Sequence, residues 1–258
     1  MTKVKNVLDK LLEKYPLELS SSFDTGKLGL QFGNPDDEVK GILITLDVTS
    51  MVIDEAIKKG YNLIISHHSM LFNPIINLDY RTPIAQKIKK ILTNNINIIS
   101  MHTNFDVAAD GMNDILAEML ELKNIVNPDG IITKDSFVRI GYVDNIKASE
   151  LVKMVQEKWL CHNVRTVGNL DKIVSKVGLV GGGGAFEMYE AIDLGCDVYI
   201  SGEFRHNNAL DALDAGIILI EVDHAVEANF RNTVKNYLVN NFNDIPINLS
   251  DARQNPFN

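Results

Sequence analysis

The segment Glu55–Ser66 reads EAIKKGYNLIIS and joins a helical pattern to a strand pattern through a glycine. Apolar residues three and four positions apart in 51–59 indicate one face of a helix, which Gly60 ends. The β-branched run 62–66 then indicates a buried strand. The same order returns in Glu190–Ser201, EAIDLGCDVYIS, which aligns without gaps and is identical at 6 of 12 positions. The sequence therefore predicts two similar α/β units.

Strand and helix patterns alternate along most of the chain, which is typical of an α/β protein with mixed, largely parallel sheets. Thr82 and Pro83 supply an N-cap and a first-turn proline for one of the helices. The polar segment 124–130, which contains Pro128, indicates a domain boundary. Strands are expected at 41–46, 62–66, 96–100, 137–143, 173–180, 197–201 and 217–222, and helices at 51–59, after 82, at 115–120, 149–159 and 186–194, before 214, and at 225–242.

Composition and charge narrow the class of protein. The 258 residues are 45% apolar and 23% charged, as in ordinary globular proteins. The net charge of −9 repels phosphate backbones and disfavours nucleic-acid binding. Cys161 and Cys196 form no paired motif, so we expect a reduced, cytoplasmic setting. The apolar runs are too short to cross a membrane.

Imidazoles and carboxylates follow four of the expected strands. In open α/β sheets, ligands bind beyond the carboxyl ends of the strands, so these are the positions to inspect for a site. Five of the six histidines fall in these windows. The side chains are His67 and His68 after the second strand, His102 and Asp106 after the third, Glu203 and His206 after 197–201, and His224 and Glu227 after 217–222.

A mixed set of imidazoles and carboxylates without thiols suits Zn, Mn, Fe or Co in a catalytic or exchangeable site. His67 and His68 stand where a strand ends and the backbone turns, so both rings can reach one cavity and serve two adjacent metals. His224 and Glu227 are three residues apart at a helix start and can share an ion. Glu227, with two oxygens, is the natural bridging ligand. The alternative for each pair is a local hydrogen bond or a solvated surface pair.

The glycine run 181–184 follows a strand and precedes a helix. The dinucleotide fingerprint requires a further glycine where Phe186 stands, so we interpret the run as a tight turn that lets a helix approach the sheet closely. Neither Ser66 nor Ser201 has the flanking glycines of a nucleophile elbow, which disfavours serine-hydrolase chemistry.

Separated motifs along nearly the whole chain resemble one known family, the GTP cyclohydrolase 1 type 2 homologs, also called NGG-one-interacting-factor-three-like proteins. Shortly before the first of these motifs, Thr25, Gly26 and Lys27 stand where the family commonly has an asparagine. A large middle insertion found in some relatives is absent. The motifs are LGLQFG (28–33), LIISHHSMLF (63–72), HTNFD (102–106), the glycine run, YISGEFRHNNAL (199–210) and DHAVE (223–227).

The resemblance implies two intertwined α/β domains, a dinuclear metal site in the cleft at the strand ends, and a hexameric ring. We accordingly expect a discontinuous first domain, 1–126 with 215–258, around a second domain, 127–214. Carried over by position, His68 and Asp106 hold one divalent ion, His67 and His224 hold the other, and Glu227 bridges them. His102 and His206 match recurrent family positions near the site.

The leading hypothesis is a dinuclear metal-dependent hydrolase acting on a nucleotide or another phosphorylated small molecule. Glu203, His206 and His102 are the candidates for moving a proton as general acid or base. The alternative is a non-catalytic protein that binds metal for regulation or assembly, with the same ligands but no exchangeable water. A third interpretation, a partner-binding scaffold with incidental histidines, predicts no stoichiometric metal.

Overall fold

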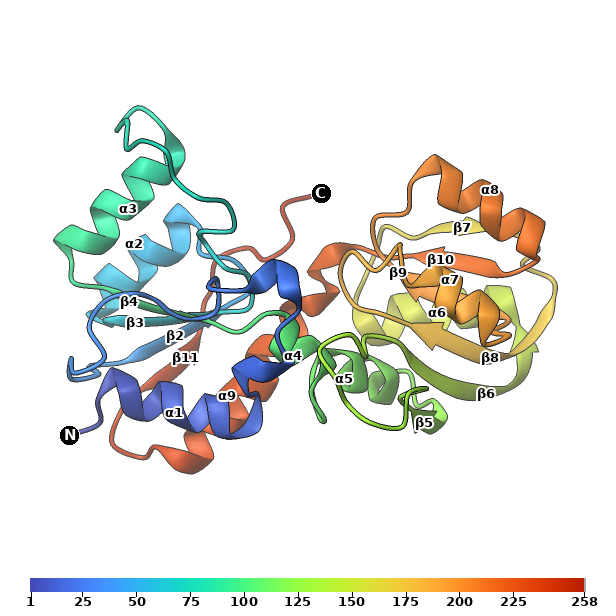
Figure 1. Cartoon of the computed structure of the whole chain (residues 1–258), viewed down its shortest axis with the longest axis horizontal. Coiled ribbons are helices and arrows are strands. Elements are labelled where there is room, and N and C mark those ends of the chain that lie inside the picture. Colours follow the sequence, from blue (N-terminus) through green and yellow to red (C-terminus); the bar gives the residue numbers. More distant parts are fainter. Residues whose placement is uncertain (258) are drawn as a thin grey trace. The chain divides into compact units, whose positions relative to one another are not determined.

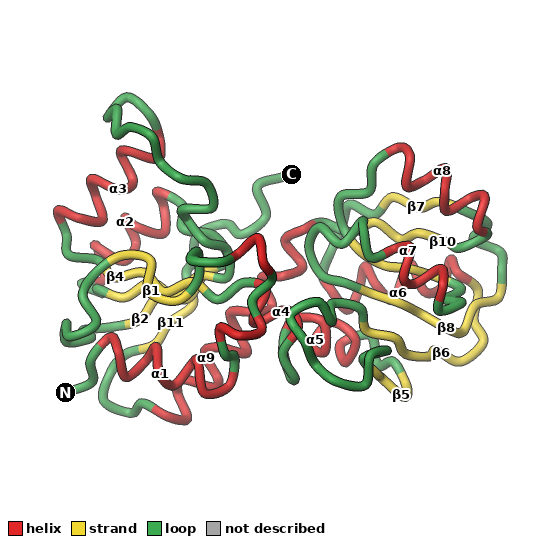
Figure 2. Tube along the Cα trace, in the orientation of Figure 1, coloured by secondary structure: helices red, strands yellow, loops and turns green. Residues whose placement is uncertain are grey.

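The computed structural model describes residues 1–257, which form two compact units. Unit 1 comprises Met1–Phe105 together with Ala228–Asn258, and unit 2 comprises Asp106–Glu227. Each unit contains one mixed sheet with helices against it (Figures 1 and 2). The chain therefore has the expected α/β class, with the sequence of unit 2 inserted into that of unit 1.

Unit 1 is built on a five-stranded sheet in the order β1-β4-β3-β2-β11. The four strands from β4 to β11 are parallel, and β1 is antiparallel to β4. The central strands are buried on both faces, as parallel strands usually are. The strands are β1 (Gly29–Phe32), β2 (Ile42–Thr45), β3 (Leu63–Ser66), β4 (Asn97–Ser100) and β11 (Ile247–Leu249).

Helices cover both faces of this sheet. Figure 1 shows α2 (Ser50–Lys59) and α3 (Pro83–Thr93) on one face, and α1 (Val4–Lys14) and α9 (Phe230–Asn241) on the other. The side chain of Thr49 accepts a hydrogen bond from the backbone of α2, and Gly60 ends the helix with a φ of +70°. Thr82 caps α3 in the same way, ahead of a proline in the first turn. The predictions for these two helices are confirmed.

Unit 2 has a six-stranded sheet in the order β5-β6-β8-β9-β10-β7. The strands β8, β9 and β10 are parallel, and the outer strands run antiparallel to their neighbours. The strands are β5 (Lys123–Val126), β6 (Arg139–Lys147), β7 (Arg165–Val167), β8 (Ile173–Leu179), β9 (Val198–Ser201) and β10 (Ile218–Glu221), and the helices are α4 (Thr103–Val107), which crosses the boundary, α5 (Met112–Met119), α6 (Ala148–Trp159), α7 (Met188–Asp193) and α8 (His206–Ala215).

The repeated sequence falls on equivalent elements of the two units. In unit 1 it covers the second half of α2 and all of β3, and in unit 2 it covers most of α7 and all of β9. Both copies turn through a glycine in the left-handed region, Gly60 at φ +70° and Gly195 at φ +67°. The two parallel cores are thus built from the same helix–glycine–strand unit.

Three local expectations need correction. The segment expected as a polar boundary overlaps β5, which pairs with β6 in the second sheet. The single helix expected at 225–242 is a 3₁₀ helix, His224–Asn229, followed by α9. The division of the chain also lies elsewhere: the boundaries expected at 126/127 and 214/215 fall inside unit 2, because β5 and β10 both belong to its sheet. Among the described residues, no helix is both long and apolar enough to span a bilayer.

Candidate metal centre

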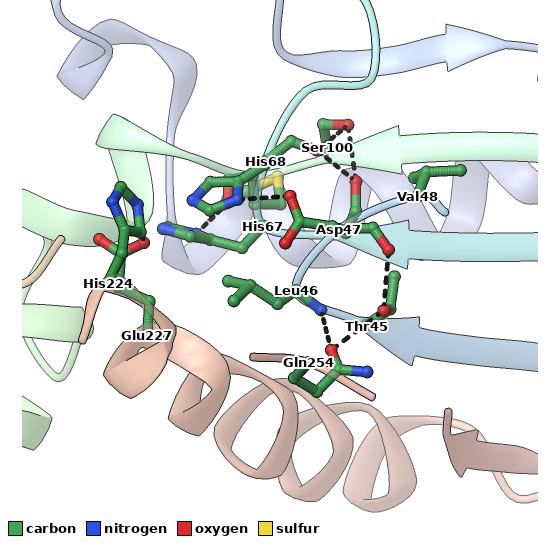
Figure 3. Close-up of polar contacts among 12 residues, drawn as sticks. Thr45, Leu46, Asp47, Val48, His67, His68, Ser100, His224, Glu227 and Gln254 are labelled. Atoms are coloured by element: carbon green, nitrogen blue, oxygen red, sulfur yellow. Dashed lines mark hydrogen bonds and ion pairs between the residues drawn. The ribbon is translucent and has the colours of Figure 1, made fainter. Parts of the chain in front are cut away.

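His67 and His68 extend directly from the end of β3 in unit 1. His67 is fully buried, its Nδ1 lies 2.8 Å from the carbonyl oxygen of Met101, and its ring packs against Phe230 at a centroid distance of 5.2 Å. His68 is partly exposed, and its Nδ1 lies 2.8 Å from Oδ1 of Asp47 (Figure 3). Each ring is therefore fixed by a bond at Nδ1.

The carboxylate that holds His68 is itself placed by the end of the neighbouring strand. Asp47 comes two residues after β2 ends. Gln254 secures this strand end, since its Oε1 accepts hydrogen bonds from the backbone of Leu46 at 2.8 Å and from the hydroxyl of Thr45 at 3.2 Å (Figure 3). A residue from the end of the described chain thus braces the strand that carries Asp47.

His102 follows β4 and is held by a buried carboxylate from early in the chain. Its Nδ1 lies 2.7 Å from Oδ2 of Asp24, and the hydroxyl of Thr103 donates to the same oxygen at 2.6 Å. Burial by itself would raise the pKa of Asp24, but these hydrogen bonds outweigh that effect and hold the pKa below its ordinary value. The ionised carboxylate is therefore the form that orients His102.

The three imidazoles of unit 1 form one cluster. The ring centroid of His67 lies 5.0 Å from that of His68 and 5.2 Å from that of His102. The centroids of His68 and His102 are 5.5 Å apart. One ring nitrogen of each lies within 4.8 Å of the others, an arrangement that could hold a metal ion. The sequence placed His102 next to the site, and the structure brings it into the cluster itself.

In unit 2, His224 lies between two carboxylates. Its Nδ1 is 2.8 Å from Oε1 of Glu203, and its Nε2 is 3.0 Å from Oε2 of Glu227. In the 3₁₀ helix that carries His224, residues three apart are eclipsed, which sets Glu227 beside the ring. The expectation that His224 and Glu227 share one helical face is confirmed. Glu227 is buried, whereas the side chain of Glu203 is 65% exposed.

The glycine run lies against both carboxylates. A Cβ added at Gly182 would lie 2.2 Å from Oε1 of Glu227, and one added at Gly183 would lie 2.9 Å from Oε2 of Glu203. The backbone of Gly184 donates to the hydroxyl of Ser201 at 2.9 Å, which joins the run to the end of β9. The run is a close-packed turn, and at Gly182 and Gly183 the two carboxylates occupy the space that a side chain would enter.

Asp106 and Glu227 follow equivalent strands of the two sheets. Ser100 pairs with the last residue of β3, and Glu221 pairs with the last residue of β9, so these residues have matching places in the two parallel sheets. Asp106 comes six residues after Ser100, and Glu227 comes six residues after Glu221. Asp106 and Glu227 are also the first and the last residue of unit 2. The two carboxylates therefore stand at the two points where the chain passes between the units.

One hydrogen-bonding pattern is common to His67, His68, His102 and His224. In each ring Nδ1 contacts a carbonyl or carboxylate oxygen. A carbonyl and an ionised carboxylate only accept, so Nδ1 donates its proton in each of these rings. Histidines that bind metals are usually held in this way, with the second nitrogen bonded to a carboxylate or a carbonyl. The residues thus suit a metal centre by chemistry as well as by position.

The sequence reasoning missed two of the orienting carboxylates and included one histidine without such a bond. Asp47 follows β2 at a strand end, so the rule that found the histidines could have found it. Asp24 lies 78 residues before His102 and gave no local signal. His206 is exposed at the first position of α8, and within residues 1–257 its side chain makes no hydrogen bond or ion pair.

Comparison with known proteins identifies the family. The model of the Duf34/NIF3 (NGG1p interacting factor 3) family matches residues 2–256, and the chain belongs to this family. A GTP cyclohydrolase 1 type 2 homolog of Clostridium acetobutylicum is 31% identical over 226 residues, which cover 86% of this chain and 84% of that protein. The fold agrees with this assignment, as the solved structures show.

Two solved structures illustrate the likeness. The crystal structure of Staphylococcus aureus protein SA1388 superposes with a TM-score of 0.90 and 28% identity, covering 100% of this chain and 99% of that one. Reduced HcgD from Methanocaldococcus jannaschii superposes with a TM-score of 0.82 and 27% identity, covering 97% and 98%. The mixed α/β fold is therefore that of the family along the whole chain.

Proposed function

We propose that the chain binds two divalent metal ions and uses them to hydrolyse a nucleotide or another phosphorylated small molecule. In this proposal His68 and Asp106 bind one ion, His67 and His224 bind the other, and Glu227 binds both. The observation that carries the proposal is the common pattern at the histidines, in which Nδ1 is bonded to a carbonyl or carboxylate oxygen, as is usual for histidines that bind metals. The positions of the two carboxylates after equivalent strands of the two sheets support it.

Bound divalent ions supply Lewis-acid chemistry, which makes water a better nucleophile near neutral pH and polarises the bond that is attacked. The chain's own residues supply orientation and proton transfer. Asp47 and Asp24 hold the Nδ1 protons of their histidines, which fixes both rings. Glu203 uses Oε1 to hold His224, and its exposed side chain leaves Oε2 to accept a proton from water as a general base.

The proposal is tested with Glu227→Gln, which keeps the volume of the side chain but removes its charge. Glu157→Gln, at an exposed position on α6, is the matched control. Protein purified without an affinity resin or chelator is measured for Zn, Mn, Fe and Co, and is then assayed with added metal against a panel of nucleotides and phosphoesters. We expect about two metal equivalents and turnover in the wild type and the control, with both lost or strongly reduced in Glu227→Gln.

The outcomes separate the alternatives. Stoichiometric metal without turnover across the panel overturns the hydrolase and favours a non-catalytic metal-binding protein in regulation or assembly. Absence of metal from the wild type overturns both. A hexameric ring and a cytoplasmic location are also part of the proposal, and light scattering that gives the mass of one subunit would contradict the ring.

A further inference from the structure

Unit 2 also has a pocket that Glu203 lines in part, and none of the proposed metal ligands lines it. The pocket has a volume of about 440 Å³, within the range typical of small-molecule sites. The residues around it that matter for recognition are Gly183, Phe186, Tyr189, Glu203, Arg205 and Asn208. They come from two stretches of chain, 183–189 through the glycine run into α7, and 203–208 from the loop after β9 into α8.

The pocket has an aromatic wall. Phe186 is 81% exposed, although a phenyl ring is normally buried, and Tyr189 is 40% exposed. Their ring centroids are 6.4 Å apart with the planes at 70°, so the two rings form a corner. Tyr189 is fixed in place, since its hydroxyl donates to Asp211 at 2.5 Å. The exposed ring of Phe186 is therefore available for a planar ring to stack upon.

The pocket also has a cation. The guanidinium of Arg205 makes no hydrogen bond or ion pair with any residue in the described range 1–257, although the chain as a whole carries a net charge of −9. Its backbone is engaged, since the N–H donates to Oδ1 of Asn208 at 3.0 Å and the carbonyl oxygen accepts from the N–H of Ala209 at 3.2 Å. A planar guanidinium with free donors suits a phosphate or a carboxylate, which it can bind with two hydrogen bonds.

The pocket is continuous with the proposed metal centre through one side chain. Glu203 lines the pocket, and its Oε1 contacts the ring of His224. Glu203 has a φ of +62°, which is uncommon for a residue other than glycine and directs its carboxylate in this way at a cost in strain. A ligand in the pocket would therefore have one end next to the general base of the proposed hydrolase.

We propose that this pocket binds the planar aromatic ring and the anionic group of a nucleotide, with the ring stacked on Phe186 and the phosphate bound by Arg205. The inference rests on the proposed function for the role of the bound ligand, and it narrows the substrate class from phosphorylated compounds in general to those with an aromatic base. It also explains why an exposed phenyl ring and an unpaired guanidinium line the same cavity.

The experiment measures binding by calorimetry, with protein as purified and after treatment with EDTA, so that it does not depend on turnover. The probes are AMP and GMP, with adenosine as a ring without phosphate and ribose 5-phosphate as a phosphate without a ring. We expect the two nucleotides to bind more tightly than either partial probe in both states of the protein.

Two variants and two matched controls locate the binding. Phe186→Ala should weaken AMP and adenosine about 10-fold and leave ribose 5-phosphate unchanged, because it removes stacking alone. Arg205→Gln should weaken AMP and ribose 5-phosphate about 10-fold and leave adenosine unchanged. The controls are Tyr142→Ala, an exposed aromatic on β6, and Arg165→Gln, an exposed arginine already paired with Glu221. Neither control should change binding.

Three results would overturn the inference. The first is the absence of nucleotide binding to both states of the protein, and the second is equal binding of AMP to the wild type and to both pocket variants. The third is a change in oligomeric mass in Phe186→Ala with binding unaltered, which would mean that the ring packs against another copy of the chain. Failure of the proposed hydrolase is a separate result, because the metal-free protein is expected to bind AMP even if no substrate is turned over.

Discussion

Gly182→Ala tests whether the glycine run sets the position of Glu227. Gly182 has a φ of +62°, and a left-handed residue other than glycine costs about 1–2 kcal/mol. The new methyl group would also lie 2.2 Å from Oε1 of Glu227 and 2.8 Å from its Cδ. That overlap adds little to the cost of folding, because the carboxylate ends a flexible side chain and can move. Its movement is the effect of interest.

Gly195→Ala is the matched control, because Gly195 has a φ of +67° and no atom within 4 Å of an added Cβ. Both variants should therefore lose about 1–2 kcal/mol of unfolding free energy, or roughly 2–8 °C in Tm. Only Gly182→Ala should also bind metal about 10- to 100-fold more weakly, which is the usual effect of disturbing the support of a metal ligand.

The assay combines thermal unfolding in EDTA with calorimetric titration of Zn or Mn into metal-free protein. Equal metal affinity in the two variants would refute the placement of Glu227 as a shared ligand. An unfolding free energy for Gly182→Ala far below that of Gly195→Ala would refute the claim that the overlap with Glu227 costs little, since it would mean that the carboxylate cannot move aside.

Three other predictions follow from the contacts described. Asp47→Ala removes the acceptor that holds His68 and should weaken metal binding about 10- to 100-fold by calorimetry, and unchanged affinity would count against the orienting role. Arg139 is 1% exposed and donates to three backbone carbonyls in addition to its ion pair, so Arg139→Met should cost about 3–5 kcal/mol in urea unfolding. A loss below about 1 kcal/mol would contradict this. Burial raises the pKa of Cys161 and Cys196 to about 11, so neither thiol should react with a disulfide reagent at pH 8 until the protein unfolds, and rapid labelling of the native protein would contradict this. The protonated thiols contribute about 3 kcal/mol each to the free energy of unfolding; this contribution is complete below pH 9 and is lost as the pH rises to 11.

The sequence contained enough to predict the parallel cores, because their strands are continuous apolar runs and their helices have caps that can be read locally. Thr49 and Gly60 bound α2 as expected. The edge strands were harder to find, since β5 and β7 are short and mostly exposed and have no alternation of apolar residues. Pairing with a neighbouring strand, which a single sequence does not reveal, makes them strands.

The histidines of the candidate site were predictable from their places after strands, and their orientation was not. Asp47 satisfied the same strand-end rule and was overlooked, so a fuller application of that rule would have found it. The bond between Asp24 and His102 depends on two segments far apart in the chain that meet only in the folded unit. Glu203 was found as a candidate acid or base, but its contact with His224 needed the left-handed backbone at Glu203.

The insertion of unit 2 into unit 1 affects the order in which the two units can fold during synthesis on the ribosome. Unit 2 is one continuous stretch and can fold as soon as Glu227 has left the exit tunnel. Unit 1 must wait for α9 and β11, which come later in the chain and supply Phe230 against the ring of His67 and the strand next to β2. The histidine cluster nearest the N-terminus in sequence is therefore completed last during synthesis.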